Sequence, residues 1–183
     1  MGKVVILGGN ARSGKSTLAY KLIKCGFNRI SFDDLYDSIE EGLNIRVDEL
    51  SKDVQNKFFE SIVNKALEEA NNNDVNTVID MFDFLPEDIN KLENKKNVEV
   101  YFLAYPNFSI DEIKYNVIHY AKSTDWIANV DDDYLDSCVK KFYERNELLV
   151  RECKKYDMKL IDTSTGEERY KVLDELLARI VNN

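Results

Sequence analysis

The residues with the clearest chemical potential form a glycine-rich segment that ends in a lysine and two hydroxyl side chains. This segment is Gly9-Asn10-Ala11-Arg12-Ser13-Gly14-Lys15-Ser16-Thr17, which satisfies every fixed position of the pattern G-x-x-x-x-G-K-[ST]. Glycine lets the backbone wrap closely around an anion, so that successive N–H groups point at phosphate oxygens. We expect Lys15 to reach the β- and γ-phosphates and Ser16 to ligate Mg²⁺. The segment therefore predicts a site for a nucleoside triphosphate and its magnesium ion.

The residues on either side of this segment agree with that prediction. Val4-Val5-Ile6-Leu7 is an apolar run typical of a strand that is covered on both faces, and Leu18, Leu22 and Ile23 follow at helical spacing. An anion at the junction between this strand and this helix would be stabilised by the partial positive charge of the helix N-terminus. The alternative is a glycine-rich turn that only joins strand and helix, and the complete pattern in this context favours the phosphate site. Arg12 either contacts phosphate or faces water.

Acidic residues follow two further strand candidates. Asp33 and Asp34 end the run that begins at Arg29, and Asp80 follows Thr77-Val78-Ile79. Because ligands of a parallel sheet gather beyond the carboxyl ends of its strands, these carboxylates are expected to face the γ-phosphate. A carboxylate there holds magnesium or accepts a proton from an attacking hydroxyl. We expect Asp80 to hold magnesium and Asp33 to contact the acceptor, while Asp34 either contacts the acceptor or caps a helix.

The remaining elements alternate between strand and helix. The patterns predict strands at 98–104 and 158–161 and helices at 51–70, 86–93, from 109, 132–155 and 168–181. Asp83 is expected to be a helix-start residue and not a ligand. This order predicts an α/β fold with a five-stranded parallel sheet flanked by helices, in one domain over residues 1–183 with a small lid at about residues 107–131.

Composition narrows the function further. Asp and Glu number 34 against 25 Lys and Arg, so the net charge is -9 and binding of a nucleic-acid backbone is disfavoured as the main task. Three widely separated cysteines and one histidine disfavour a zinc site. We find neither a leader segment nor an apolar run of membrane-spanning length, so we expect a cytoplasmic protein without a membrane partner.

The phosphate-binding segment together with Ser31-Phe32-Asp33-Asp34-Leu35 resembles the small P-loop kinases of adenylate-kinase-like fold that phosphorylate a hydroxyl, including polynucleotide 5′-kinases, zeta toxins and chloramphenicol phosphotransferase. In members of that group an aspartate at the end of the second strand takes the acceptor's proton. The resemblance thus implies that Asp33 is the catalytic base and that ATP and Mg²⁺ are the cofactors. Val78-Ile79-Asp80 resembles the third strand of adenylate-kinase-like enzymes, which implies that Asp80 supports magnesium.

The positions of the arginines along the chain indicate the chemical class of the acceptor. Nucleoside monophosphate kinases of this group grip phosphates with several arginines, whose forked guanidinium suits the task. Here no arginine lies between Arg46 and Arg145, which favours a hydroxyl-bearing small molecule over a nucleoside monophosphate or a switch that only hydrolyses nucleotide. Arg145 is either an arginine that stabilises transition-state charge or an ordinary helix charge. Arg46 either contacts the acceptor or is a solvated loop charge, and Trp126 either closes over substrate or anchors its segment.

Overall fold

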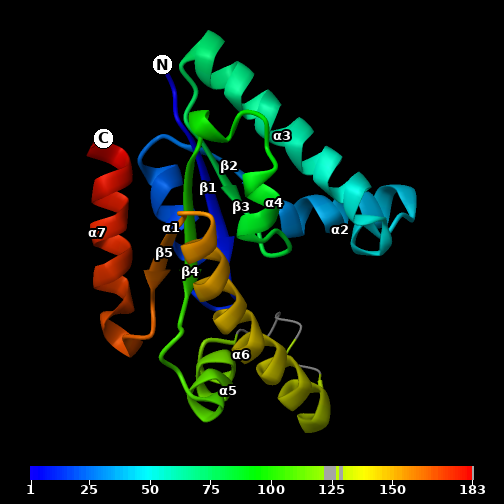
Figure 1. Ribbon diagram of the computed structural model, residues 1–183, viewed down its shortest axis with the longest axis vertical. Coiled ribbons are helices and arrows are strands. Elements are labelled where there is room, and N and C mark those ends of the chain that lie inside the picture. Colours follow the sequence, from blue (N-terminus) through cyan, green and yellow to red (C-terminus); the bar gives the residue numbers. More distant parts are fainter. Residues whose placement is uncertain (122–126, 128–129, 183) are drawn as a thin grey trace.

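A computed structural model describes residues 1–121, 127 and 130–182 of the chain (Figure 1). Its centre is a five-stranded sheet with the strand order β2-β3-β1-β4-β5, in which every neighbouring pair is parallel. The strands are β1 (Val4–Gly9), β2 (Asn28–Ser31), β3 (Thr77–Asp80), β4 (Glu99–Ala104) and β5 (Lys159–Asp162). The predicted five-stranded parallel α/β fold is confirmed, and each strand lies within two residues of its predicted bounds.

Helices cover both faces of the sheet (Figure 1). They are α1 (Lys15–Lys24), α2 (Phe32–Leu43), α3 (Lys52–Asn73), α4 (Pro86–Asn90), α5 (Ile110–His119), α6 (Asp132–Lys155) and α7 (Arg169–Asn182), with short 3-10 helices η1 (Val47–Glu49), η2 (Lys95–Asn97) and η4 (Gly166–Glu168). Along β1, Val5 and Leu7 pack with α1 and α7, while Val4 and Ile6 pack with α3, α4 and α6. This alternation buries β1 on both sides, as its apolar run predicts.

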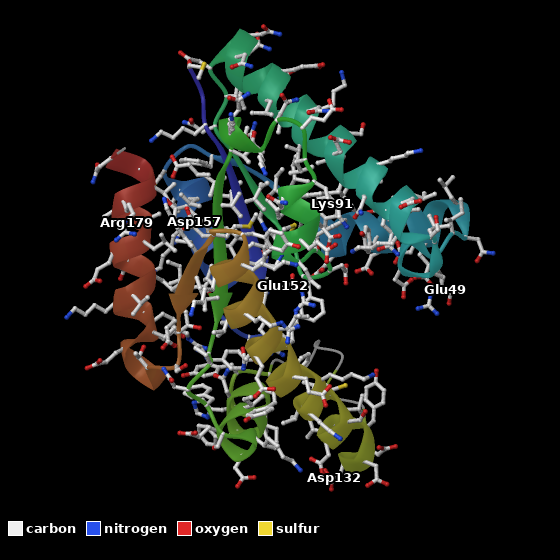
Figure 2. All side chains as sticks on the ribbon, in the orientation of Figure 1. Glu49, Lys91, Asp132, Glu152, Asp157 and Arg179 are labelled. Atoms are coloured by element: carbon white, nitrogen blue, oxygen red, sulfur yellow. The ribbon has the colours of Figure 1, made fainter. Side chains whose placement is uncertain are left out.

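Helix α6 extends beyond the sheet and carries a second core. Its first half packs with α5 around Ile113, Val117 and Val139, in a lobe below the sheet (Figure 1). Its second half returns to the sheet, where Leu149 and Cys153 join the main core. Figure 2 shows Asp132 at the outer end of α6 and Glu152 near its sheet end. One continuous helix, α6, therefore links the lobe to the sheet.

Several helix ends follow the sequence signals. Ser109 and Glu112 form the predicted capping box of α5, with the Ser109 N–H donating to Glu112 Oε2 at 2.7 Å. The predicted bounds 132–155 are those of α6, whose N-cap is Asp131. The expectation that Asp83 is a helix-start residue was wrong, because α4 begins at Pro86 with Leu85 as its N-cap. In the described part of the chain, no helix has both the length and the apolar composition that crossing a bilayer requires.

Helices α2 and α3 differ from the predictions, and α4 ends at Asn90 instead of residue 93. Helix α2 was not predicted, because Asp33 and Asp34 were placed at a strand end. They instead form its first turn, with the Ser31 hydroxyl accepting the Asp34 N–H as the N-cap. Helix α3 continues to Asn73, beyond the predicted end at residue 70, and Val54 near its start is 47% exposed. The residues buried on α3 are Gln55, Phe59, Val63, Ala66, Leu67 and Ala70.

Candidate functional site

The phosphate loop lies between β1 and α1, and two glycines permit its path. Gly9 has φ of 131°, and a Cβ there would lie 2.0 Å from the Leu103 carbonyl oxygen. Gly14 has φ of 99° and precedes Lys15 as the N-cap of α1, where no side chain accepts the first N–H groups. These donors are therefore available to an anion at the helix N-terminus.

Lys15 is folded into this loop. Its ammonium donates to the Asn10 carbonyl oxygen at 2.6 Å, and the side chain is buried. Burial lowers the pKa of Lys15, whereas the negative charges of Asp80 and Asp33 raise it. The ammonium thus lies between its own loop and two of the carboxylates that the sequence singled out.

Residues of the phosphate loop line two separate cavities. Arg12, Lys15 and Ser16 contribute to both. The first cavity has a volume of about 330 Å³, and its other lining residues are Gly14, Thr17, Tyr20, Tyr120, Arg169 and Tyr170. The second has a volume of about 470 Å³, and its other lining residues are Ala11, Asp33, Phe82 and Phe142. The residues of the predicted phosphate loop thus face two ligand-sized spaces.

The first cavity has an aromatic and cationic wall built around Arg169. This buried arginine donates through Nη1 to the Arg12 carbonyl oxygen at 2.9 Å and to Asn116 Oδ1 at 3.2 Å. Its guanidinium lies 4.3 Å from the centre of the Tyr120 ring. Aromatic rings and guanidinium planes suit a nucleobase and phosphates. Neither Arg169 nor Tyr120 was identified from the sequence, because they lie far along the chain from the loop.

Of the two neighbouring aspartates, Asp33 lines the second cavity and Asp34 does not. Asp33 lines it from the first turn of α2, and the surrounding protein raises the pKa of its carboxyl by desolvation, an effect that Lys15 opposes. The Asp34 carboxylate turns to Arg29 at 3.2 Å and is 73% exposed. Asp33 therefore lies beside Lys15 in the cavity, whereas Asp34 lies in the first turn of α2, which Ser31 caps, and pairs with Arg29 outside the cavity.

Asp80 lies at the carboxyl end of β3, opposite Leu7 of β1. Its side chain is buried and accepts a hydrogen bond from Arg29 Nη2 at 2.9 Å. Arg29 was not identified from the sequence, since a charged residue on an edge strand carries no distinctive signal. Among the described residues, no three or more His, Cys, Asp or Glu side chains form a metal-binding group. A magnesium ion here would therefore rely on Ser16, phosphate oxygens, water and one or two carboxylates, which is the ligand set that Mg²⁺ favours.

Arg145 packs against Phe82, which lines the second cavity, but does not itself line that cavity. It donates through Nη2 to the Phe82 carbonyl oxygen, and its guanidinium is 4.2 Å from the centre of the Phe82 ring. Burial lowers the pKa of Arg145, and the neighbouring Asp83 carboxylate raises it. Burial likewise raises the pKa of Asp83. Asp83 therefore belongs to the surroundings of the site, and the role of Arg145 at the γ-phosphate stays a prediction.

Buried hydrogen bonds fasten the phosphate loop to α6. Asn10 Nδ2 donates to the Phe142 carbonyl oxygen at 2.7 Å and to Asn146 Oδ1 at 2.9 Å. Asn146 Nδ2 donates to the Tyr105 carbonyl oxygen at 3.2 Å, and the Tyr105 hydroxyl donates to the Ala11 carbonyl oxygen at 2.8 Å. The loop, the end of β4 and α6 therefore share one network.

The remaining predicted residues lie elsewhere. Arg46 forms ion pairs with Asp48 at 2.9 Å and Glu49 at 2.8 Å, at the tip between α2 and α3 where Figure 2 labels Glu49. It does not line either cavity, so the structure does not bring it together with Asp33. Trp126 lies outside the described residues. Of the predicted lid at 107–131 the structure describes α5 and its flanks, and closure of this segment stays a prediction.

Comparison with known proteins identifies the fold of this chain. No model of a protein family matches the chain, and no curated protein matches it. A gluconokinase from Sinorhizobium meliloti 1021 is similar in structure, with a TM-score of 0.58, 18% identity and coverage of 100% of this chain and 94% of that one. A shikimate kinase from Bacteroides thetaiotaomicron has a TM-score of 0.60, 16% identity and coverage of 99% of both chains. A sugar kinase from Janibacter sp. HTCC2649 has a TM-score of 0.63, 15% identity and coverage of 98% and 95%. The chain thus has the fold of small P-loop kinases.

Proposed function

We propose that this protein is an ATP-dependent kinase that transfers the γ-phosphate to a hydroxyl of a small molecule. The observation that carries the proposal is that Lys15 and Ser16 line two cavities, of which only the second contains Asp33. ATP would occupy the first cavity with its γ-phosphate at the loop, and the acceptor would occupy the second. The similar structures, which are described as a gluconokinase, a shikimate kinase and a sugar kinase, support this class of reaction.

The chain's own residues account for the steps of such a transfer. Asp33 accepts the proton of the acceptor hydroxyl. The oxygen of that hydroxyl bonds to the γ-phosphorus, and the bond between the γ-phosphorus and the β–γ bridging oxygen breaks to release ADP. The raised pKa of Asp33 makes its carboxylate a stronger base than an ordinary aspartate. Lys15 leaves the Asn10 carbonyl to hold the γ-phosphate, and the first N–H groups of α1 bind the phosphates.

We propose Mg²⁺ as the metal, held by the Ser16 hydroxyl with support from Asp80. The donor set fits, because Ser16 is exposed in the loop and Asp80 lies at the end of the neighbouring strand. Bound magnesium would neutralise charge on the phosphate oxygens. Arg29 holds the Asp80 carboxylate in place through the 2.9 Å ion pair, which fixes its orientation.

The direct test is incubation with Mg–ATP and a panel of hydroxyl compounds, with phosphorylated products identified by mass spectrometry. We expect Asp33→Asn to lower the transfer rate by about 10² to 10⁴, while nucleotide affinity is retained. Asp34→Asn is the matched control, because its carboxylate faces Arg29 at 3.2 Å. A full transfer rate in Asp33→Asn would show that Asp33 is not the base.

Two other functions are outcomes of the same test. A nucleoside monophosphate kinase would form ADP only with a specific monophosphate, yet Arg12 is the one guanidinium among the described residues that line the second cavity. A nucleotide-hydrolysing switch would release phosphate without any phosphorylated organic product. The lining of the second cavity favours the small-molecule kinase over both.

A further inference from the structure

The second cavity has two kinds of wall. Its polar lining residues are Arg12, Lys15, Ser16 and Asp33, all of which lie at the transfer end. The rest of its described lining consists of Ala11, Phe82 and Phe142. No side chain on this second wall can donate to or accept from an acceptor hydroxyl. Away from the transfer end, the described cavity therefore offers a ligand an apolar, aromatic surface.

This aromatic wall is held in place. The rings of Phe82 and Phe142 meet edge to face, with centroids 6.3 Å apart and an interplanar angle of 82°. Arg145 stacks on Phe82, and the Phe142 backbone is tied to the loop through Asn10. The Phe82 ring centre is 5.8 Å from Lys15 Nζ, so the wall begins immediately beside the point of transfer.

Phe82 and Phe142 also line a third cavity of about 410 Å³, whose other lining residues are Lys141, Glu144, Arg145 and Leu148. The apolar wall of the second cavity is therefore formed by these two rings and Ala11. A sugar-like polyol is poorly matched to such walls, since each hydroxyl buried without a partner costs about tenfold in binding.

Building on the proposed function, we propose that the acceptor is an aromatic alcohol, a compound that carries the reactive hydroxyl on or next to an apolar ring, and not a polyol. The ring packs on Phe82 and Phe142 in the offset or edge-to-face arrangements that aromatic pairs prefer. The hydroxyl is then directed to Asp33 and the γ-phosphate. This acceptor class differs from the acceptors named in the descriptions of the gluconokinase and the sugar kinase of similar fold.

The test compares two panels of similar molecular size with the full chain and Mg–ATP. One panel holds aromatic alcohols such as benzyl and phenethyl alcohols with varied ring substituents, and the other holds hexoses, gluconate and shikimate. We expect kcat/KM at least about tenfold higher for the best aromatic alcohol than for any polyol. Products are identified by mass spectrometry.

Two variants locate the effect. Phe82→Leu keeps an apolar side chain but removes the ring, and we expect it to raise KM for the aromatic acceptor by about three- to tenfold, with the Kd of ATP unchanged. Phe27→Leu is the matched control, because Phe27 is buried in the core between the sheet and helices α1 and α7. It should leave acceptor KM unchanged. An equal rise of KM in both variants would contradict a role for the Phe82 ring.

The outcomes separate this inference from the proposed function. Efficient phosphorylation of polyols but not of aromatic alcohols would overturn the inference and leave the kinase intact. ATP hydrolysis without product from either panel would overturn both, as would failure of the protein to bind Mg–ATP.

Discussion

Asp33 and Lys15 share a partly desolvated environment. Desolvation raises the pKa of Asp33 above its ordinary 3.8 and lowers that of Lys15 below its ordinary 10.5. Asp33 must be ionised to accept a proton, so the rate falls as pH drops through its raised pKa. Lys15 must be protonated to bind phosphate, so the rate also falls as pH rises through its lowered pKa. We therefore expect a bell-shaped profile of kcat/KM with both limbs shifted inward.

The profile is measured from kcat/KM at fixed ionic strength, since this parameter reports groups of the free enzyme. The acidic limb should disappear in Asp33→Asn and persist in Asp34→Asn. If the two limbs of the profile fell at the ordinary pKa values of an aspartate and a lysine, the environment described for the site would be contradicted.

Arg29 is expected to matter more for stability than for chemistry. Its ion pair with the buried Asp80 is 2.9 Å long, and the two side chains are 15% and 6% exposed. Arg29→Met would leave the Asp80 carboxylate buried without its partner, and we expect the free energy of unfolding to fall by about 3 kcal/mol. Arg46→Met is the control, because its ion pairs lie on the surface and should contribute little. Denaturant titration distinguishes the two variants, and equal losses would contradict the distinction.

At the scale of elements, the strands were predictable because a central parallel strand is apolar on both faces, as Val4 to Leu7 shows. Helix α2 was missed although Phe32, Leu35, Tyr36 and Ile39 repeat at helical spacing. Its first turn holds the acidic pair, which was taken as a strand end. The consequence is favourable for function, because a helical turn fixes Asp33 more firmly than a loop would.

Helix α6 is expected to control the phosphate loop through Asn146. This residue is buried, and its amide bonds both Asn10 and the backbone of Tyr105. Asn146→Ala would leave the Asn10 amide short of a partner, so we expect weaker ATP binding as well as lower stability. A double-mutant cycle of Asn10→Ala and Asn146→Ala should give a coupling of about 1–2 kcal/mol in the free energy of ATP binding.

The comparison pair is Asn64 and Asn94, whose hydrogen bond is 3.0 Å long and lies on the surface. Its cycle should give no coupling in ATP binding. A coupling of similar size in both cycles would mean that Asn146 acts only through general stability.

At the scale of the whole molecule, the phosphate loop was predictable because its residues are contiguous, whereas the second wall of the site was not. Asn10 and Asn146 are 136 residues apart, yet they share a buried hydrogen bond. Phe142 carries no motif, and Arg145 was a candidate only by its residue type; on the sequence alone both belong to an ordinary amphipathic helix. Only the path of α6 past the end of β1 brings them to Lys15 and Phe82.

The net charge of -9 makes the binding of a polyphosphate depend on local cations. Bound to ATP, Mg²⁺ would neutralise part of the nucleotide's own charge, so the metal should govern the affinity of the protein for ATP. With Mg–ATP at 100 times Kd, we expect stabilisation of about 2.7 kcal/mol and a rise in Tm of roughly 5–10 °C. ATP with EDTA should give a much smaller rise, and Lys15→Met should give almost none with either. A rise of Tm that is equal with and without magnesium would show that the ion has no part in nucleotide binding, even if Lys15 does.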